Sequence, residues 1–87
     1  MNTLKIYRIW DWTNKYNYIK GCYSEAIVVA YSEEEAKIIH PNGKDKLPMK
    51  YASAWATHPE QIDVEYLGEY SGERYSEPSV VLTTWIS

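Results

Sequence analysis

Cys22, His40 and His58 are the residues of this chain best suited to metal binding or nucleophilic catalysis, and their spacing indicates neither. The two histidines stand apart, outside any HxxH or HxxxH pattern, and there is one cysteine. A zinc site needs four protein ligands, or three and a water. A cysteine beside a strand is usually a small buried apolar group. We therefore predict no metal site, no cofactor and no disulfide within the chain.

Other patterns of catalytic residues are also missing from the sequence. Ser24 and Ser32 lack the glycines of a nucleophile elbow, and the four glycines are spread over the chain rather than gathered in a phosphate-binding loop. The twelve acidic residues fall at a predicted helix start, on the wet face of a predicted strand and in loops. We predict that the protein is not an enzyme and assign no catalytic residue.

Aromatic residues give the strongest signal of a binding site. The chain has nine Tyr, four Trp and no Phe, so every ring carries a polar group as well as a large apolar surface. Such rings, with lysines between them, can hold a protein partner or stack on a nucleobase. Alternatively, the aromatic loop Asp11–Gly21 folds back and caps the sheet. The candidate partner-binding residues are Trp10, Trp12, Lys15, Tyr16, Tyr18 and Lys20.

The charge of the chain is mildly negative and unevenly distributed. A net charge of −3 argues against direct binding to nucleic acid, which requires a basic surface. The acidic residues of the C-terminal part are interpreted either as an ordinary solvated surface or as an acidic face toward a basic partner. The residues of this candidate acidic face are Asp63, Glu65, Glu69 and Glu73.

Four segments show the composition and periodicity of strands. Thr3–Trp10 has apolar residues on both faces, Ala26–Tyr31 is a continuous β-branched run, and Ile62–Leu67 alternates, with Ile62, Val64 and Tyr66 inward. The fourth segment is Val80–Ile86. The segments Asp11–Gly21 and Gly68–Ser79 are predicted to be loops. Ala26–Tyr31 is also the longest apolar run, far too short to cross a membrane.

One short helix is predicted to begin after Ser32. Ser32 can accept a hydrogen bond from the N–H of Glu35, and the Glu35 carboxylate can reach back to the N–H of Ser32. Pro41 prevents continuation, so the helix has about two turns and reaches His40. In the segment 44–58, an alanine-rich stretch around Trp55 suggests a helical turn, and Pro59 begins another single turn.

The predicted element order is therefore β-β-α-β-β in a single domain, residues 1–87. This order favours an α+β fold in which one short helix packs on a four-stranded, mainly antiparallel sheet. The strand order is not determined by the sequence. Met1–Ile9 lacks the apolar stretch of a secretory signal, so we expect a cytoplasmic protein without membrane association.

The segment Ala26–Gly43, with Ser32-Glu33-Glu34-Glu35-Ala36 followed by His40-Pro41 and Gly43, resembles a family of very small bacteriophage and prophage proteins. The resemblance continues through "KIYRI" at Lys5–Ile9, Trp55, "PEQIDVEYLGEY" at Pro59–Tyr70 and the last apolar segment Val80–Ile86. It implies a phage origin and a bacterial host cell. It implies no mechanism, because the family has no settled activity.

Three hypotheses follow. The first is a non-catalytic accessory protein that binds and blocks a bacterial host protein, for example a component of a defence system, an argument by association. The second is a protein that sequesters a small nucleotide by aromatic stacking between subunits. The third is a virion or assembly protein, in which the chain self-associates through a free sheet edge. The sequence leaves open whether the chain forms a homo-oligomer.

Overall fold

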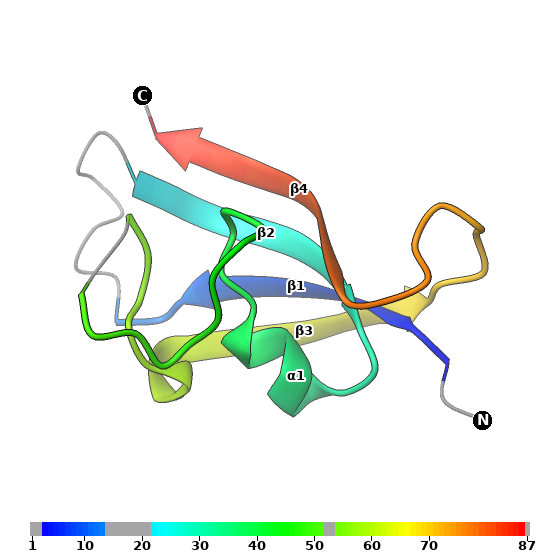
Figure 1. The fold of residues 1–87 in the computed structure, drawn as a ribbon, viewed down its shortest axis with the longest axis horizontal. Helices are drawn as coiled ribbons and strands as arrows, with labels where there is room; N and C mark the ends of the chain where they lie inside the picture. Colours follow the sequence, from blue (N-terminus) through cyan, green and yellow to red (C-terminus); the bar gives the residue numbers. More distant parts are fainter. Residues whose placement is uncertain (1–2, 14–21, 52–53, 87) are drawn as a thin grey trace.

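Four strands form one antiparallel sheet with a short helix on one face, as the sequence predicts (Figure 1). The computed structural model describes residues 3–13, 22–51 and 54–86. The strands are β1 (Lys5–Asp11), β2 (Cys22–Ala30), β3 (Ile62–Glu69) and β4 (Ser79–Ile86). The helix α1 spans Glu33–Ile38, and a single 3-10 turn, η1, spans Pro59–Gln61. The α+β fold class is thereby confirmed.

The strands are arranged in the order β3-β1-β2-β4, which the sequence did not reveal. Strands β3 and β4 follow each other in the chain yet form opposite edges of the sheet. The connection between them, residues 70–78, passes around one end of the two central strands (Figure 1). It is fixed there because the Tyr70 N–H donates to the Leu4 carbonyl and the Tyr31 hydroxyl donates to the Ser76 carbonyl.

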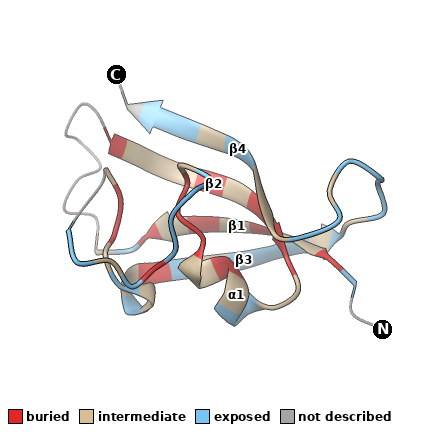
Figure 2. Ribbon diagram, viewed as in Figure 1, coloured by how far each residue is buried: buried red, intermediate tan, exposed pale blue. Residues whose placement is uncertain are grey.

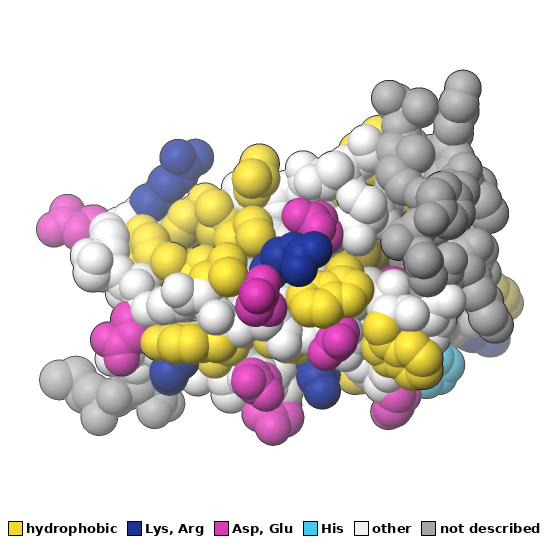
Figure 3. Space-filling view, turned by 180° about the vertical axis from the view of Figure 1, so that it is seen from behind, with side chains coloured by type: hydrophobic (Ala, Val, Ile, Leu, Met, Phe, Trp, Pro, Cys, Tyr) yellow, Lys and Arg dark blue, Asp and Glu magenta, His cyan; other side chains and the backbone are white. Residues whose placement is uncertain are grey.

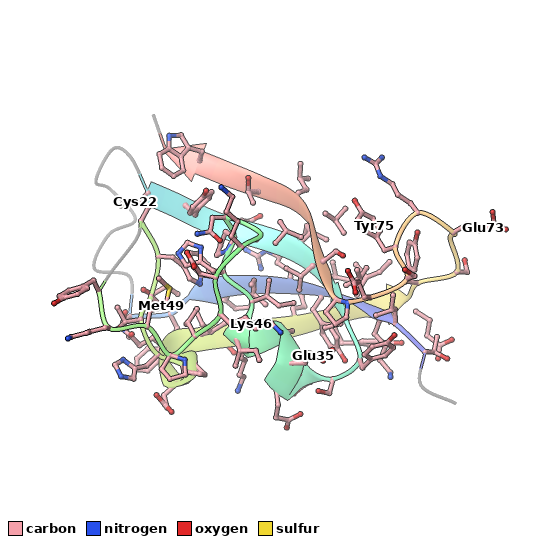
Figure 4. The ribbon with its side chains drawn as sticks, in the orientation of Figure 1. Cys22, Glu35, Lys46, Met49, Glu73 and Tyr75 are labelled. Atoms are coloured by element: carbon pink, nitrogen blue, oxygen red, sulfur yellow. The ribbon has the colours of Figure 1, made fainter. Side chains whose placement is uncertain are left out.

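Of the two hydrogen bonds predicted at the start of the helix, one is confirmed and one is wrong. The Ser32 Oγ accepts from the Glu35 N–H at 3.2 Å, as expected of an N-cap. The Glu35 carboxylate, however, accepts from the N–H of Tyr31 at 2.6 Å, rather than from that of Ser32. It therefore ties the first turn of α1 to the residue that follows β2 (Glu35 is labelled in Figure 4).

The helix is shorter than predicted, at six residues. Ile39 is already extended, with φ −77° and ψ 123°, and forms a bridge with Lys46. His40 therefore lies in the following turn instead of in the helix. A second expectation, a helical turn around Trp55, is also wrong for the described residues, because Trp55 is buried within irregular backbone.

The core lies between one face of the sheet and the layer formed by α1 and residues 39–51 and 54–61 (Figure 2). On the sheet side, Tyr7 stands opposite Val28, and Ile9 stands opposite Ala26. The opposing layer places its own side chains against them. Its core members are Ala36, Ile39, Leu47, Trp55 and Ala56, and Ile62 at the start of β3 belongs to the sheet side.

Strand β3 departs from the predicted pattern near its end. It continues through Gly68 to Glu69, where a loop was expected. An extra residue, Leu67, interrupts the pairing between Ile6–Gly68 and Tyr7–Tyr66. Ile62 and Val64 contribute to the core as predicted, but Tyr66 is half exposed and contacts Tyr7 edge-on. The inward assignment of Tyr66 is therefore only partly correct.

Candidate binding surface

The face of the sheet away from α1 displays most of the side chains that alternate with the core residues, although Val29, which pairs with Ile6, is buried. Paired residues on neighbouring strands project to the same side of a sheet. Arg8 stands opposite both Ile27 and Glu65, Trp10 stands opposite Asp63, and Ile27 stands opposite Leu82. We call this surface the open face and define it by these residues: Ile6, Arg8, Trp10, Glu25, Ile27, Asp63, Glu65 and Leu82.

The guanidinium of Arg8 occupies the centre of the open face. Its Nε and Nη2 donate to the same Glu25 oxygen at 3.1 and 2.8 Å, and its Nη1 lies 3.6 Å from Glu65. The guanidinium carbon also lies 4.5 Å from the ring centroid of Trp10. The hydrogen bond to Glu25 raises the pKa of Arg8 above its ordinary value. Arg8 is thus held as a fixed cation on an aromatic ring, between two carboxylates.

Figure 3, which views the molecule from the side opposite to that of Figure 1, shows a basic group between acidic groups on the surface, with hydrophobic side chains next to it. The hydrophobic part includes Ile27 and Leu82, of which Leu82 is strongly exposed. A surface that combines exposed apolar side chains, an aromatic ring and an oriented arginine has the composition of a protein-binding site.

Two residues of the predicted aromatic site lie in the described part of the chain. Trp10 is half-buried in β1 and belongs to the open face. Trp12 is exposed, and its indole N–H donates to the Glu60 carbonyl at 2.8 Å, which holds the ring beside η1. The structure therefore gives Trp12 a partner within the chain while leaving its ring accessible. The other predicted residues, Lys15, Tyr16, Tyr18 and Lys20, lie outside the described residues.

The predicted acidic residues separate into two groups. Asp63 and Glu65 are exposed on β3 and share the open face with Trp10 and Arg8. Glu69 pairs with Lys5, whose side chain alternates with that of Ile6 and so points away from the open face. Glu73 lies in the β3–β4 connection, far from Cys22 at the opposite end of the molecule (Figure 4). Trp10 of the predicted aromatic site thus shares one surface with Asp63 and Glu65 of the predicted acidic face.

Arg8 is the residue that the sequence prediction missed. From the sequence, Arg8 is assigned no role. The sequence nevertheless contains a signal for Arg8, because it lies between Tyr7 and Ile9 in a predicted strand with apolar residues on both faces. An arginine between apolar positions of a central strand indicates a partner for its charge.

The histidines and the cysteine occupy separate structural positions. His40 is fully buried, its Nδ1 accepts from the Asn42 N–H at 3.0 Å, and its ring meets the edge of Tyr23. His58 is exposed before η1, where its N–H donates to the Gln61 side chain. Cys22 is a free, buried thiol. Within residues 3–13, 22–51 and 54–86, no group of three acidic, histidine or cysteine side chains could hold a metal ion.

Comparison of the chain with models of known protein families, with curated proteins and with solved structures finds no match. The resemblance to small phage proteins therefore stays a prediction. None of the helices in the described part of the chain is long and apolar enough to span a membrane. The alternative of nucleotide stacking also stays a prediction, since most of the residues assigned to it lie outside the described part.

Proposed function

We propose that this protein is a non-catalytic binding protein of phage type that docks on a bacterial host protein through its open face and blocks it. The observation that carries the proposal is the asymmetry of the sheet. Its inner face is covered by α1 and residues 39–51 and 54–61, whereas its outer face presents an oriented arginine, a tryptophan and an exposed leucine. Arginine and tryptophan are the residue types that contribute most to binding energy at protein interfaces.

Arg8 is suited to this role because its side chain is already ordered. Two hydrogen bonds to Glu25 and the stacking on Trp10 fix the guanidinium before a partner arrives. Ordering a free arginine on binding costs about 0.5–1.5 kcal/mol, and much of this cost is avoided here. Trp10 and the hydrocarbon part of Arg8 can then be buried together at the centre of the interface.

The charges at the edge of the open face indicate the type of partner. Asp63 and Glu65 are exposed on β3, and the whole chain carries a net charge of −3. Complementary charges increase the rate of association and exclude like-charged partners. The target therefore presents a basic patch beside an apolar one. The predicted phage origin makes a cytoplasmic component of a bacterial defence system, whose surface binds nucleic acid, the proposed class of target.

The test is a phage-plating assay in bacterial strains that each carry one defined nucleic-acid-targeting defence system. Expression of the protein is expected to restore plaque formation against at least one system. The Glu65→Lys variant reverses a charge on the open face and should lose this activity. The matched control, Glu73→Lys, makes the same change in the β3–β4 connection and should keep it. Circular dichroism would verify that both variants are folded.

Two results would overturn the proposal. If expression restored plaque formation against none of the systems, a blocking role in defence would be wrong. If Glu65→Lys and Glu73→Lys behaved alike, the open face would not be the docking surface.

A further inference from the structure

The two edge strands of the sheet, β3 and β4, differ in how their unpaired backbone groups are protected. Edge strands expose unpaired backbone N–H and C=O groups, and proteins usually protect them with charged residues or proline. Strand β3 is protected in this way, because it carries Asp63, Glu65 and Glu69. Strand β4, with the sequence SVVLTTWI, contains neither a charged residue nor a proline.

The side chains of β4 reinforce the contrast. Three of its large hydrophobic side chains, those of Val81, Leu82 and Trp85, are exposed. An eight-residue edge strand rich in β-branched and aromatic residues, uncharged and exposed, has the composition of a strand that pairs with another. The edge therefore lacks the charges and proline that prevent pairing and has the composition that favours it.

We propose that β4 pairs antiparallel with β4 of a second copy of this chain, so that two sheets join into one of eight strands around a two-fold axis. Antiparallel pairing of identical strands is self-complementary and closes at a dimer. Because β4 is uncharged, self-pairing brings no like charges together, whereas pairing of β3 with β3 would place carboxylates against carboxylates. A second copy is thus the occupant that fits β4.

The pairing register follows from the irregularity in β4. Ile27 stands opposite Leu82 and Val28 stands opposite Val80, so Val81 is an extra, bulged residue. The regular part of the strand runs from Leu82 to its end, and Thr84 is its centre. Centring the two-fold axis on Thr84 places Thr84 opposite its own copy and Thr83 opposite Trp85. Thr–Thr and aromatic–β-branched pairs are both favourable across antiparallel strands.

The size of the contact sets the expected strength of the dimer. A strand of eight residues is about 27 Å long, and one strand pair buries less than the roughly 800 Å² per partner of a standard stable interface. We therefore expect reversible association, with a dissociation constant on the order of micromolar rather than nanomolar.

Analytical ultracentrifugation of the full chain tests the dimer, from about 5 µM to about 500 µM, a range chosen to span micromolar dissociation constants. The wild-type mass should rise with concentration from 10.2 kDa toward twice that value. Leu82→Lys places a charge on β4 and should remain monomeric. The matched control Leu67→Lys makes the same change on β3, at similar exposure (50% against 63%), and should still dimerise.

Disulfide trapping tests the register without requiring tight association. Residues directly opposite each other across antiparallel strands lie about 4.5–5.5 Å apart at Cα, within the range that a disulfide spans. Under mild oxidation, Thr84→Cys should form covalent dimers much faster than Leu67→Cys. The wild type is the background control, because its Cys22 is buried.

A wild-type chain that stays monomeric across the whole range would overturn the proposal and leave the β4 edge for a strand of a different protein. Equal dimerisation of the Leu82→Lys and Leu67→Lys variants, or equal trapping of the two cysteine variants, would also overturn it. These outcomes are independent of the plating assay, so the dimer and the blocking function can fail separately.

Discussion

The hydrogen bonds of Arg8 give a quantitative prediction about the open face. Replacing Arg8 by Met keeps most of the hydrocarbon chain but removes the charge and all donors. The variant loses two hydrogen bonds to Glu25, the longer ion pair with Glu65 and the contact with the Trp10 ring. It also leaves the carboxylates of Glu25 and Glu65 without the cation between them, so the open face gains uncompensated negative charge.

The magnitude follows from distance and exposure. The side chains of Arg8 and Glu25 are 37% and 35% exposed, so their 2.8 Å pair is screened by solvent and worth about 0.5–1 kcal/mol. Glu65 is 55% exposed and 3.6 Å away, which reduces its share to about 0–0.3 kcal/mol. The contact with Trp10 adds about 0.5–1 kcal/mol. Arg8→Met should therefore lower the free energy of unfolding by about 1–2 kcal/mol.

Two double-mutant cycles separate these contributions, with urea unfolding followed by circular dichroism as the assay. The first combines Arg8→Met with Glu25→Gln and should give a coupling energy of about 0.5–1 kcal/mol that decreases in roughly 1 M salt. The second combines Arg8→Met with Glu65→Gln and should give almost none. A coupling to Glu65 as large as that to Glu25 would refute the assigned geometry.

Three further predictions concern stability and can be checked by urea unfolding. Ser32→Ala removes the acceptor for the Glu35 N–H and should cost about 1 kcal/mol, whereas Ser32→Asp, which retains an acceptor, should cost less. Burial and, as the second cause, the charge of Glu33 raise the pKa of Tyr7. The stability that this raised pKa contributes is present below the unfolded pKa of about 10 and is lost as pH rises through the folded pKa. Tyr7→Phe should therefore lose less stability than the wild type between about pH 9 and pH 11. Ala54 has a φ of 62°, so Ala54→Gly should raise the free energy of unfolding by about 0.5 kcal/mol, and a loss would show that no strain is relieved.

Local patterns made the helix start and the strands predictable. Ser32 with Glu35 three residues later, and β-branched runs at two-residue periodicity, each determine structure over a few residues. The second hydrogen bond of the cap differed because Tyr31, which follows the buried strand β2, presents its N–H to the Glu35 carboxylate. The early helix end has a similar cause, since the bridge between Ile39 and Lys46 extends the backbone before Pro41.

Such local patterns could not predict contacts between residues that are far apart in the sequence. The order β3-β1-β2-β4 depends on pairings between segments more than fifty residues apart, such as Tyr7 with Tyr66. Trp55 is buried without regular secondary structure, so no periodicity marks it. The binding surface needed the same information, because only the register places Trp10 beside Asp63 and Arg8 beside Glu65. Residue types identified Trp10, Asp63 and Glu65 as candidates, and strand pairing placed them beside Arg8.

The two proposals have a joint geometric consequence. A two-fold axis that pairs β4 with its copy in one sheet must stand perpendicular to that sheet, so the two open faces point to the same side. The dimer then presents two Arg8 clusters on one continuous surface, with Leu82 of each copy near the axis. A target with repeated sites, such as an oligomeric or filamentous assembly, would bind both copies at once and gain affinity through effective concentration. Leu82→Lys alters a side chain of the open face and also removes the dimer contact, so it should weaken binding of such a repeated target more than it weakens binding of one isolated target subunit.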